Sequence, residues 1–259
     1  LPGLSAWHRV VDYRLGRLRA LPNVSLHPAS LLTAQDVEEF GAGHVVIATG
    51  ARWLPELCAP SELPSGTVPD APRVLTPDDV FAGAGVEGPV AVFDFDNYYM
   101  GSALAEALSD RGLPVTYVTT AGAAAAWGFM TNEQPLVHQS FARRGIGYVT
   151  LHVVAGFDGD TLRLAQIFTG EPREIAARTL VVVGARSGGS ALHDALAPRL
   201  PRDRLHLTGD ALAPGAIVHA VYAGHRTARE LGRPAAETAP RRDAPFAPEG
   251  LPPAAMAAQ

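Results

Sequence analysis

Apolar residues recur along this chain with two spacings, one typical of helices and one typical of strands. Residues 8–20 carry apolar positions at helical spacing beside a basic outer face, and residues 216–231 predict a closing helix. Residues 131–134 can cap a further helix that runs to about Arg144, and Thr33 can cap a short one. Strands are predicted at residues 24–27 and 44–50, from residue 90, and at residues 113–118, 146–154, 161–168, 174–183 and 205–210, the last with its turn.

The arrangement of these strands predicts two kinds of sheet in one α/β fold. The strands at 146–154, 161–168 and 174–183 are separated by turns rich in Asp, Gly and Pro, which predicts an antiparallel meander. Residues 179–184 then return to a parallel sheet. Residues 54–88 are rich in Pro, Gly and Asp and are interpreted as an excursion between domains.

The segment that begins at Val90 has the order of a dinucleotide-binding βαβ unit. Its strand enters a short turn, a helix follows at residues 102–108, and a second strand follows at residues 113–118. A working unit of this kind carries G-x-G-x-x-G at the turn, because only glycine lets the backbone contact a pyrophosphate.

This turn has lost two of its three glycines. Asp96 stands where the first belongs and Tyr98 where the second belongs, and only the helix-packing Gly101 remains. The acidic residue expected at the end of the second strand is replaced by Thr119 and Thr120. A carboxylate and a phenol ring would repel and fill the phosphate site. We therefore expect a nucleotide fold kept for architecture, which binds no NAD(P) at this turn.

Two other strands end in small-residue turns, at Ala48–Gly50 and Thr208–Asp210. Both would lie at carboxyl ends of strands, where open α/β sheets bind ligands, and the helix from Ala216 can point its positive end at the same anion. Asp210 either accepts a hydrogen bond from a ribose or water, or caps a turn. The predicted cofactor-binding residues are Ala48, Thr49, Gly50, Gly209, Asp210, Ala216 and Ile217.

The remaining polar residues predict neither a catalytic residue nor a metal site. Asp94 and Asp96 are two residues apart, and we interpret them as turn acceptors that hold backbone N–H groups. His219 and His225 do not share a helical face, so capping or solvated roles are expected. Cys58 is the single cysteine, which excludes an internal disulfide and a cysteine-bound cluster.

Composition and charge narrow the class further. Hydrophobic residues make up 47% and charged residues 18% of the 259 residues, as in a compact folded protein. The net charge of −5 argues against nucleic acid and anionic membranes as partners. The sequence shows neither a signal peptide nor an apolar run long enough to span a bilayer, and we expect a cytoplasmic location. The chain begins at Leu1 without a methionine, which suggests a fragment or a processed piece.

Taken together, these residues resemble the carboxyl-terminal third of the trimethylamine/dimethylamine/histamine dehydrogenase group, iron–sulfur flavoproteins related to old yellow enzyme and 2,4-dienoyl-CoA reductase. The resemblance covers nearly the whole chain. The matching stretches are Leu1–Leu4 with Trp7, Asp12–Arg14, His44–Trp53, Asp96–Leu108 and Gly209–Arg226.

The resemblance implies a complete protein of three parts. An amino-terminal TIM barrel would carry covalent FMN and a [4Fe–4S] cluster, and two further domains would resemble the FAD and NAD(P)H domains of disulfide reductases. ADP or FAD would bind the first of these, and electrons would leave through an electron-transferring flavoprotein. The implied partners are the barrel portion or subunit and a second copy in a homo-oligomer.

The resulting prediction is two interleaved Rossmann-like domains, without the first βαβ unit. Residues 1–60 and 200–240 would form an incomplete ADP/FAD-type domain, residues 85–195 an inserted degenerate NAD(P)-type domain, and residues 241–259 a tail. The complete protein would oxidatively demethylate or deaminate a small amine, and this chain alone would not be catalytic. Two alternatives stay open: part of an NAD(P)H-dependent ene-reductase of the dienoyl-CoA reductase type, and a non-catalytic structural or interaction subunit.

Overall fold

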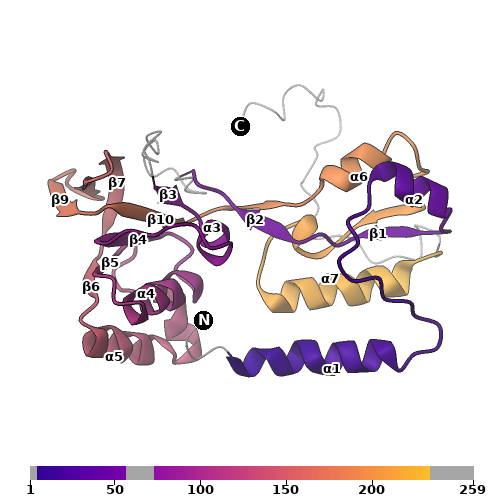
Figure 1. The fold of residues 1–259 in the computed structure, drawn as a ribbon, viewed down its shortest axis with the longest axis horizontal. Coiled ribbons are helices and arrows are strands. Elements are labelled where there is room, and N and C mark those ends of the chain that lie inside the picture. Colours follow the sequence, from indigo (N-terminus) through magenta and orange to yellow (C-terminus); the bar gives the residue numbers. More distant parts are fainter. Residues whose placement is uncertain (1–4, 57–72, 234–259) are drawn as a thin grey trace.

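The structure, a computed structural model, describes residues 5–56 and 73–233. Its helices and strands form two lobes that are joined by a narrow two-stranded connection (Figure 1). The predicted tail at 241–259 and Cys58 lie outside the described residues. Within the part of the chain that the structure describes, no helix is long and apolar enough to cross a membrane.

One lobe is built on a parallel sheet of five strands in the order β3-β10-β4-β5-β6. Every residue of β4 and β10 is buried, because a parallel sheet is covered on both faces and its strands are continuous apolar runs. The strands are β3 (Val74–Leu75), β4 (Val90–Asp94), β5 (Val115–Thr119), β6 (Gly147–Val149) and β10 (Thr179–Val183).

Helices cover one face of this sheet and an antiparallel meander covers the other. Val92 packs with Leu104 and Phe141 on the helical face, whereas the neighbouring Phe93 packs with Phe157 on the meander face, as the pleat requires. The helices are α3 (Pro77–Phe81), α4 (Met100–Asp110) and α5 (Gln134–Arg144), with the short helix η2 (Ala126–Thr131). The meander consists of β7 (His152–Phe157), β8 (Thr161–Gln166) and β9 (Pro172–Ala176).

The other lobe holds a parallel pair of strands and a much smaller core. The buried side chains Ile47, Leu196 and Leu205 form its cluster. Val46 in the middle of β1 remains 40% exposed, and α1 buries none of its residues. The elements are η1 (Ser5–Trp7), α1 (His8–Arg19), α2 (Ala34–Phe40), β1 (Val45–Ile47), α6 (Ala191–Leu196), β12 (Leu205–Leu207), η3 (Gly209–Ala211) and α7 (Ile217–Glu230).

The connection between the lobes is the antiparallel pair β2 (Ala51–Trp53) and β11 (Arg186–Gly188). The chain thus crosses from one lobe to the other after β1 and returns after β10 (Figure 1). The predicted α/β class, with a parallel sheet and an appended antiparallel meander, is confirmed. The domain boundaries stay a prediction, although β3 pairs with β10 and therefore extends the five-stranded sheet to residues before 85.

Several local predictions need correction. Residues 24–27 form no strand, because the structure provides no neighbouring strand with which they pair. The strand predicted at 146–154 is two strands, because Leu151 adopts a left-handed conformation with φ 59° and breaks the run. The strand predicted as buried at 44–50 is confined to β1, of which only Ile47 is buried. The Pro-rich excursion at 54–88 contains β3 and α3 in its described part.

Candidate functional site

The two small-residue turns predicted to bind a cofactor leave the same edge of one sheet. Strands β1 and β12 run parallel with Ile47 opposite Leu207, and the Thr208 amide donates to the Ile47 carbonyl at 3.0 Å. Residues 48–50 and 209–210 therefore lie just beyond the carboxyl ends of these two neighbouring strands. This edge is where open α/β sheets bind ligands. The structure brings them together, whereas their role in holding a ligand stays a prediction.

A third segment, from the connection between the lobes, closes this edge. The Gly189 amide donates to the Gly50 carbonyl at 2.8 Å, and the Thr49 hydroxyl donates to the Gly189 carbonyl at 2.5 Å. A Cβ atom on Gly188 would lie 2.4 Å from the Ala211 carbonyl oxygen, so the backbones approach too closely for any other residue. The three loops are thereby fixed against one another.

Asp210 holds the loop that leads from β12 to α7. Its carboxylate accepts a hydrogen bond from the Gly215 amide at 3.2 Å and lies 3.5 Å from the Arg186 guanidinium. Asp210 therefore caps this turn, and its role toward a ribose or water stays a prediction. Arg186 also donates to the Gly215 carbonyl, and its guanidinium carbon lies 5.1 Å from the centre of the Trp53 ring.

The amino-terminal end of α7 points into the same region. The Ala216 amide donates to Nδ1 of His219 at 3.1 Å, which confirms the capping role expected for this histidine. The Thr227 hydroxyl donates to the buried Thr208 hydroxyl at 2.9 Å and ties the helix to the end of β12. The side chain of Ile217 is exposed. A helix amino terminus carries partial positive charge, so this edge suits an anionic ligand.

Arg186 is the functional candidate that the sequence analysis missed. Its guanidinium group lies next to Asp210 on one side. Burial raises the pKa of Asp96 in the degenerate turn, and the positive charge of Arg186 partly opposes this rise. Arg186 therefore interacts with turns of both lobes. An arginine three residues after a buried strand, shortly before Gly188 and Gly189, was the available signal in the sequence.

The degenerate turn of the other lobe is closed by its own side chains. Asp94 is buried, and its carboxylate accepts hydrogen bonds from the Tyr117 hydroxyl at 2.6 Å and from the backbone N–H of Asn97 at 2.8 Å. Burial raises the pKa of Asp94 to about 7, although the two hydrogen bonds favour the charged form. Asp94 is thus the turn acceptor that the sequence predicted.

The remaining polar groups of this turn are paired in the same way. Asn97 adopts a left-handed conformation with φ 54°, and its side-chain oxygen accepts from Thr119 at 2.6 Å. A Cβ atom on Gly101 would lie 2.3 Å from Cγ of Asp94, so the carboxyl group fills the space beneath the first turn of α4. Burial and the neighbouring Asp94 charge raise the pKa of Tyr117 well above its ordinary value. Within the described ranges, no group of three or more His, Cys, Asp or Glu side chains could hold a metal ion.

Comparison with known proteins identifies relatives of this arrangement, although no family model matches the chain. Dimethylamine dehydrogenase of Hyphomicrobium sp. (strain x) is 29% identical over 264 residues, which cover 89% of this chain and 36% of that protein. Histamine dehydrogenase from Rhizobium sp. 4-9 matches 96% of this chain and 39% of its own, with 34% identity and a TM-score of 0.85. These matches support the trimethylamine/dimethylamine/histamine dehydrogenase group as the group of this chain. This confirms the resemblance inferred from the sequence.

A further solved structure, of an amine oxidase, is similar over most of the chain. The 6-hydroxypseudooxynicotine amine oxidase HisD from Pseudomonas geniculata N1 covers 90% of this chain and 35% of its own, with 37% identity and a TM-score of 0.84. Coverage of this extent includes both lobes, so these two solved structures share their arrangement. The chain spans between 35% and 39% of the length of these three relatives.

Proposed function

We propose that this chain is the carboxyl-terminal nucleotide-binding and scaffold part of an oxidoreductase that acts on amine C–N bonds. The carrying observation is the match of both lobes to proteins named as a histamine dehydrogenase and an amine oxidase, at 34% and 37% identity. The complete protein would oxidatively demethylate or deaminate a small amine and pass the electrons to a flavoprotein acceptor. FMN and a [4Fe–4S] cluster would belong to a barrel outside this chain, and homo-oligomers are expected.

The nucleotide proposed for this chain is ADP or FAD, at the edge where β1 and β12 end. The residues present fit an anionic pyrophosphate, because glycine turns expose the backbone, α7 supplies its positive end and Arg186 supplies a cation. Ala48, Thr49 and Gly50 would line one side. Gly209, Asp210, Ala216 and Ile217 would line the other. Within this chain these residues bind and orient the nucleotide, and none is assigned a catalytic step.

The exposed surfaces of this lobe support the proposal that a further βαβ unit completes it. Parallel sheets are ordinarily covered on both faces, yet β1 leaves Val46 40% exposed. Helix α1 likewise presents Val11 and Tyr13 to solvent. Such a unit would extend the two-stranded sheet and supply the glycine-rich turn for the pyrophosphate.

The filled turn at Asp96–Gly101 supports the amine dehydrogenase reading over an NAD(P)H-dependent reductase. The phosphates of a dinucleotide would meet the Asp96 carboxyl group and the Tyr98 ring, which stand where two glycines belong, and the buried Asp94 carboxyl group adds a second acid beneath α4. The non-catalytic scaffold alternative makes a different prediction, since a purified scaffold would carry no redox-active flavin.

The proposal is tested by anaerobic titration of the purified full protein with dimethylamine, trimethylamine or histamine, and separately with NADH. We expect one of the amines, and not NADH, to bleach flavin absorbance between 300 and 600 nm. Reduction by NADH alone would establish the reductase alternative, and a protein without flavin absorbance would establish the scaffold. Acid extraction and chromatography of the same sample would identify the bound nucleotide as ADP or FAD.

A further inference from the structure

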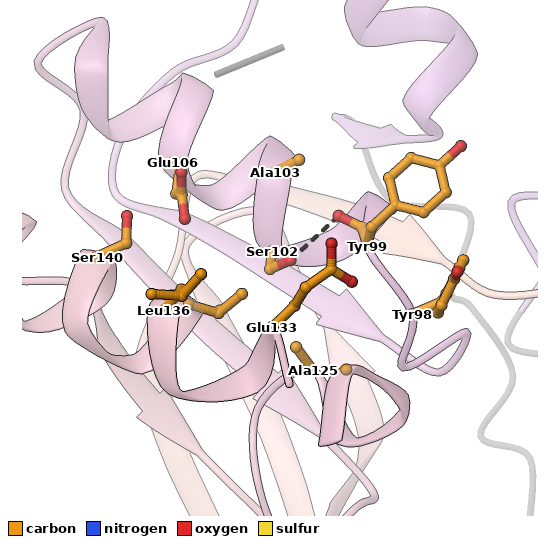
Figure 2. Close-up of a pocket in the computed structure, with 11 residues that line it drawn as sticks. Tyr98, Tyr99, Ser102, Ala103, Glu106, Ala125, Glu133, Leu136 and Ser140 are labelled. Carbon is orange, nitrogen blue, oxygen red and sulfur yellow. Dashed lines mark hydrogen bonds between the residues drawn. The ribbon is translucent and has the colours of Figure 1, made fainter. Parts of the chain in front are cut away.

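A pocket of about 270 Å³ opens between α4, η2 and the start of α5, on the opposite lobe from the proposed nucleotide edge. Small residues, among them Ala103, Ala125 and Gly128, leave the space open. Tyr98 and Tyr99 stand at one end, and Glu106 lies at the other end beside Ser140 (Figure 2). Pockets for small ligands begin at about 300 Å³, so this one suits a ligand of few atoms.

The charge of this pocket is negative. Glu106 of α4 and Glu133 at the start of α5 both line it, and its lining, as far as the chain is described, includes no Lys, Arg or His. The Thr131 hydroxyl donates to the Glu133 carboxylate at 2.6 Å. The nearby Arg144 contacts Ser140 and forms a salt bridge with Asp110 at 2.8 Å, and it also interacts electrostatically with Glu106.

The aromatic side chains add a second feature that favours a cation. Tyr98 and Tyr99 lie edge to face, with ring centroids 5.3 Å apart and an interplanar angle of 73°. Both residues line the pocket, and both side chains are partly exposed. The negative face of a phenol ring attracts an organic ammonium ion, and several rings around one pocket form the aromatic cages that bind such ions.

The place of the pocket in the fold is one where ligands bind. It adjoins the first turn of α4, the helix that follows the carboxyl end of β4 after the turn at residues 95–99. A dinucleotide unit uses this position for an anion, whereas here the carboxylates of Glu106 and Glu133 would repel one. We propose that this pocket binds a small organic ammonium ion between the two tyrosine rings and the two glutamates. This inference goes beyond the proposed function and does not depend on it.

The test uses choline and its neutral isostere 3,3-dimethylbutan-1-ol, which replaces the charged nitrogen by carbon. Binding of each to the purified full protein is measured by calorimetric titration, with sodium chloride as the salt control. We expect saturable binding of choline that is at least about threefold tighter than binding of the neutral alcohol. Equal affinity for the two compounds, or no saturable binding of choline, would overturn the proposal.

Matched variants locate the binding. The double variant Glu106→Gln/Glu133→Gln should weaken choline binding about 2- to 25-fold, because each exposed ion pair contributes a factor of about 1.5 to 5. Tyr99→Leu keeps apolar bulk and should weaken it about two- to fivefold. Glu174→Gln, on exposed β9, and Phe168→Leu, in the exposed turn before β9, are the controls and should bind choline like the unmodified protein.

A second reading of the same variants separates binding from folding. All five substituted side chains are at least partly exposed, so urea unfolding midpoints should stay close to that of the unmodified protein. Choline affinity that is unchanged in the glutamate and Tyr99 variants would place the ammonium ion elsewhere in the protein and refute the assignment to this pocket.

Discussion

Replacing Asp94 by asparagine tests whether a buried carboxyl group makes this protein less stable as the pH rises. In the folded protein burial raises the pKa of Asp94 from 3.8 to about 7. Between these two values the folded state keeps a proton that the unfolded state releases. The free energy of unfolding must therefore fall as the pH rises through this window, and the contribution of Asp94 is fully lost above about pH 7.

The magnitude follows from the size of the shift. A pKa shift of one unit corresponds to 1.36 kcal/mol, so the shift of about three units corresponds to about 4 kcal/mol between pH 4 and pH 7. Asparagine has the shape of the carboxyl group, can accept from the Asn97 amide and can donate to the Tyr117 hydroxyl, and it does not titrate. At pH 8 the variant should be more stable than the unmodified protein, and at pH 4 this advantage should be smaller by about 4 kcal/mol.

The assay is urea unfolding of both proteins at half-unit steps from pH 4 to pH 8. The difference in unfolding free energy between the two proteins removes the contribution of every other titrating group. This difference should change by about 1.4 kcal/mol per pH unit near pH 5.5. A difference that is constant across the range would show that Asp94 ionises in the folded protein as it does in water, and would refute the reasoning.

Three further perturbations have simpler outcomes. Gly101→Ala should destabilise the protein by about 1–3 kcal/mol, because the added methyl group clashes with the Asp94 carboxyl group beneath α4. Gly16→Ala is the control, since Gly16 has open space around it in α1, and it should stabilise the protein by up to about 1 kcal/mol. Equal urea midpoints of the two variants would contradict this. Thr76→Ala removes a capping box on α3 and should lower the unfolding free energy by about 1 kcal/mol in the same assay, and an unchanged value would contradict this. Arg186→Gln should reduce the amount of nucleotide recovered by acid extraction, because it removes a cation from the proposed nucleotide edge. Arg19→Gln, on exposed α1, should leave that amount unchanged. Equal recovery from the two variants would show that Arg186 does not hold the nucleotide.

The local elements with strong physical causes could be predicted from the sequence. The continuous apolar runs of β4 and β10 indicated strands covered on both faces, and Thr33 with Asp36 indicated a helix start that the structure shows as a capping box. The run at 24–27 failed for a related reason, since alternation makes a strand possible but only a neighbouring strand makes it pair.

The sequence by itself determined the fold class, the family and the loss of two glycines at the degenerate turn, because each depends on residues that are close together in the chain. Only the tertiary structure decided which distant segments meet. The alignment of β1 with β12 and the place of Arg186 beside Asp210 depend on strand register and on the connection between the lobes. The pocket between Tyr98 and Glu133 likewise exists only once α4 and α5 pack side by side. These features depend on burial and on contacts across long loops, which local spacing does not specify.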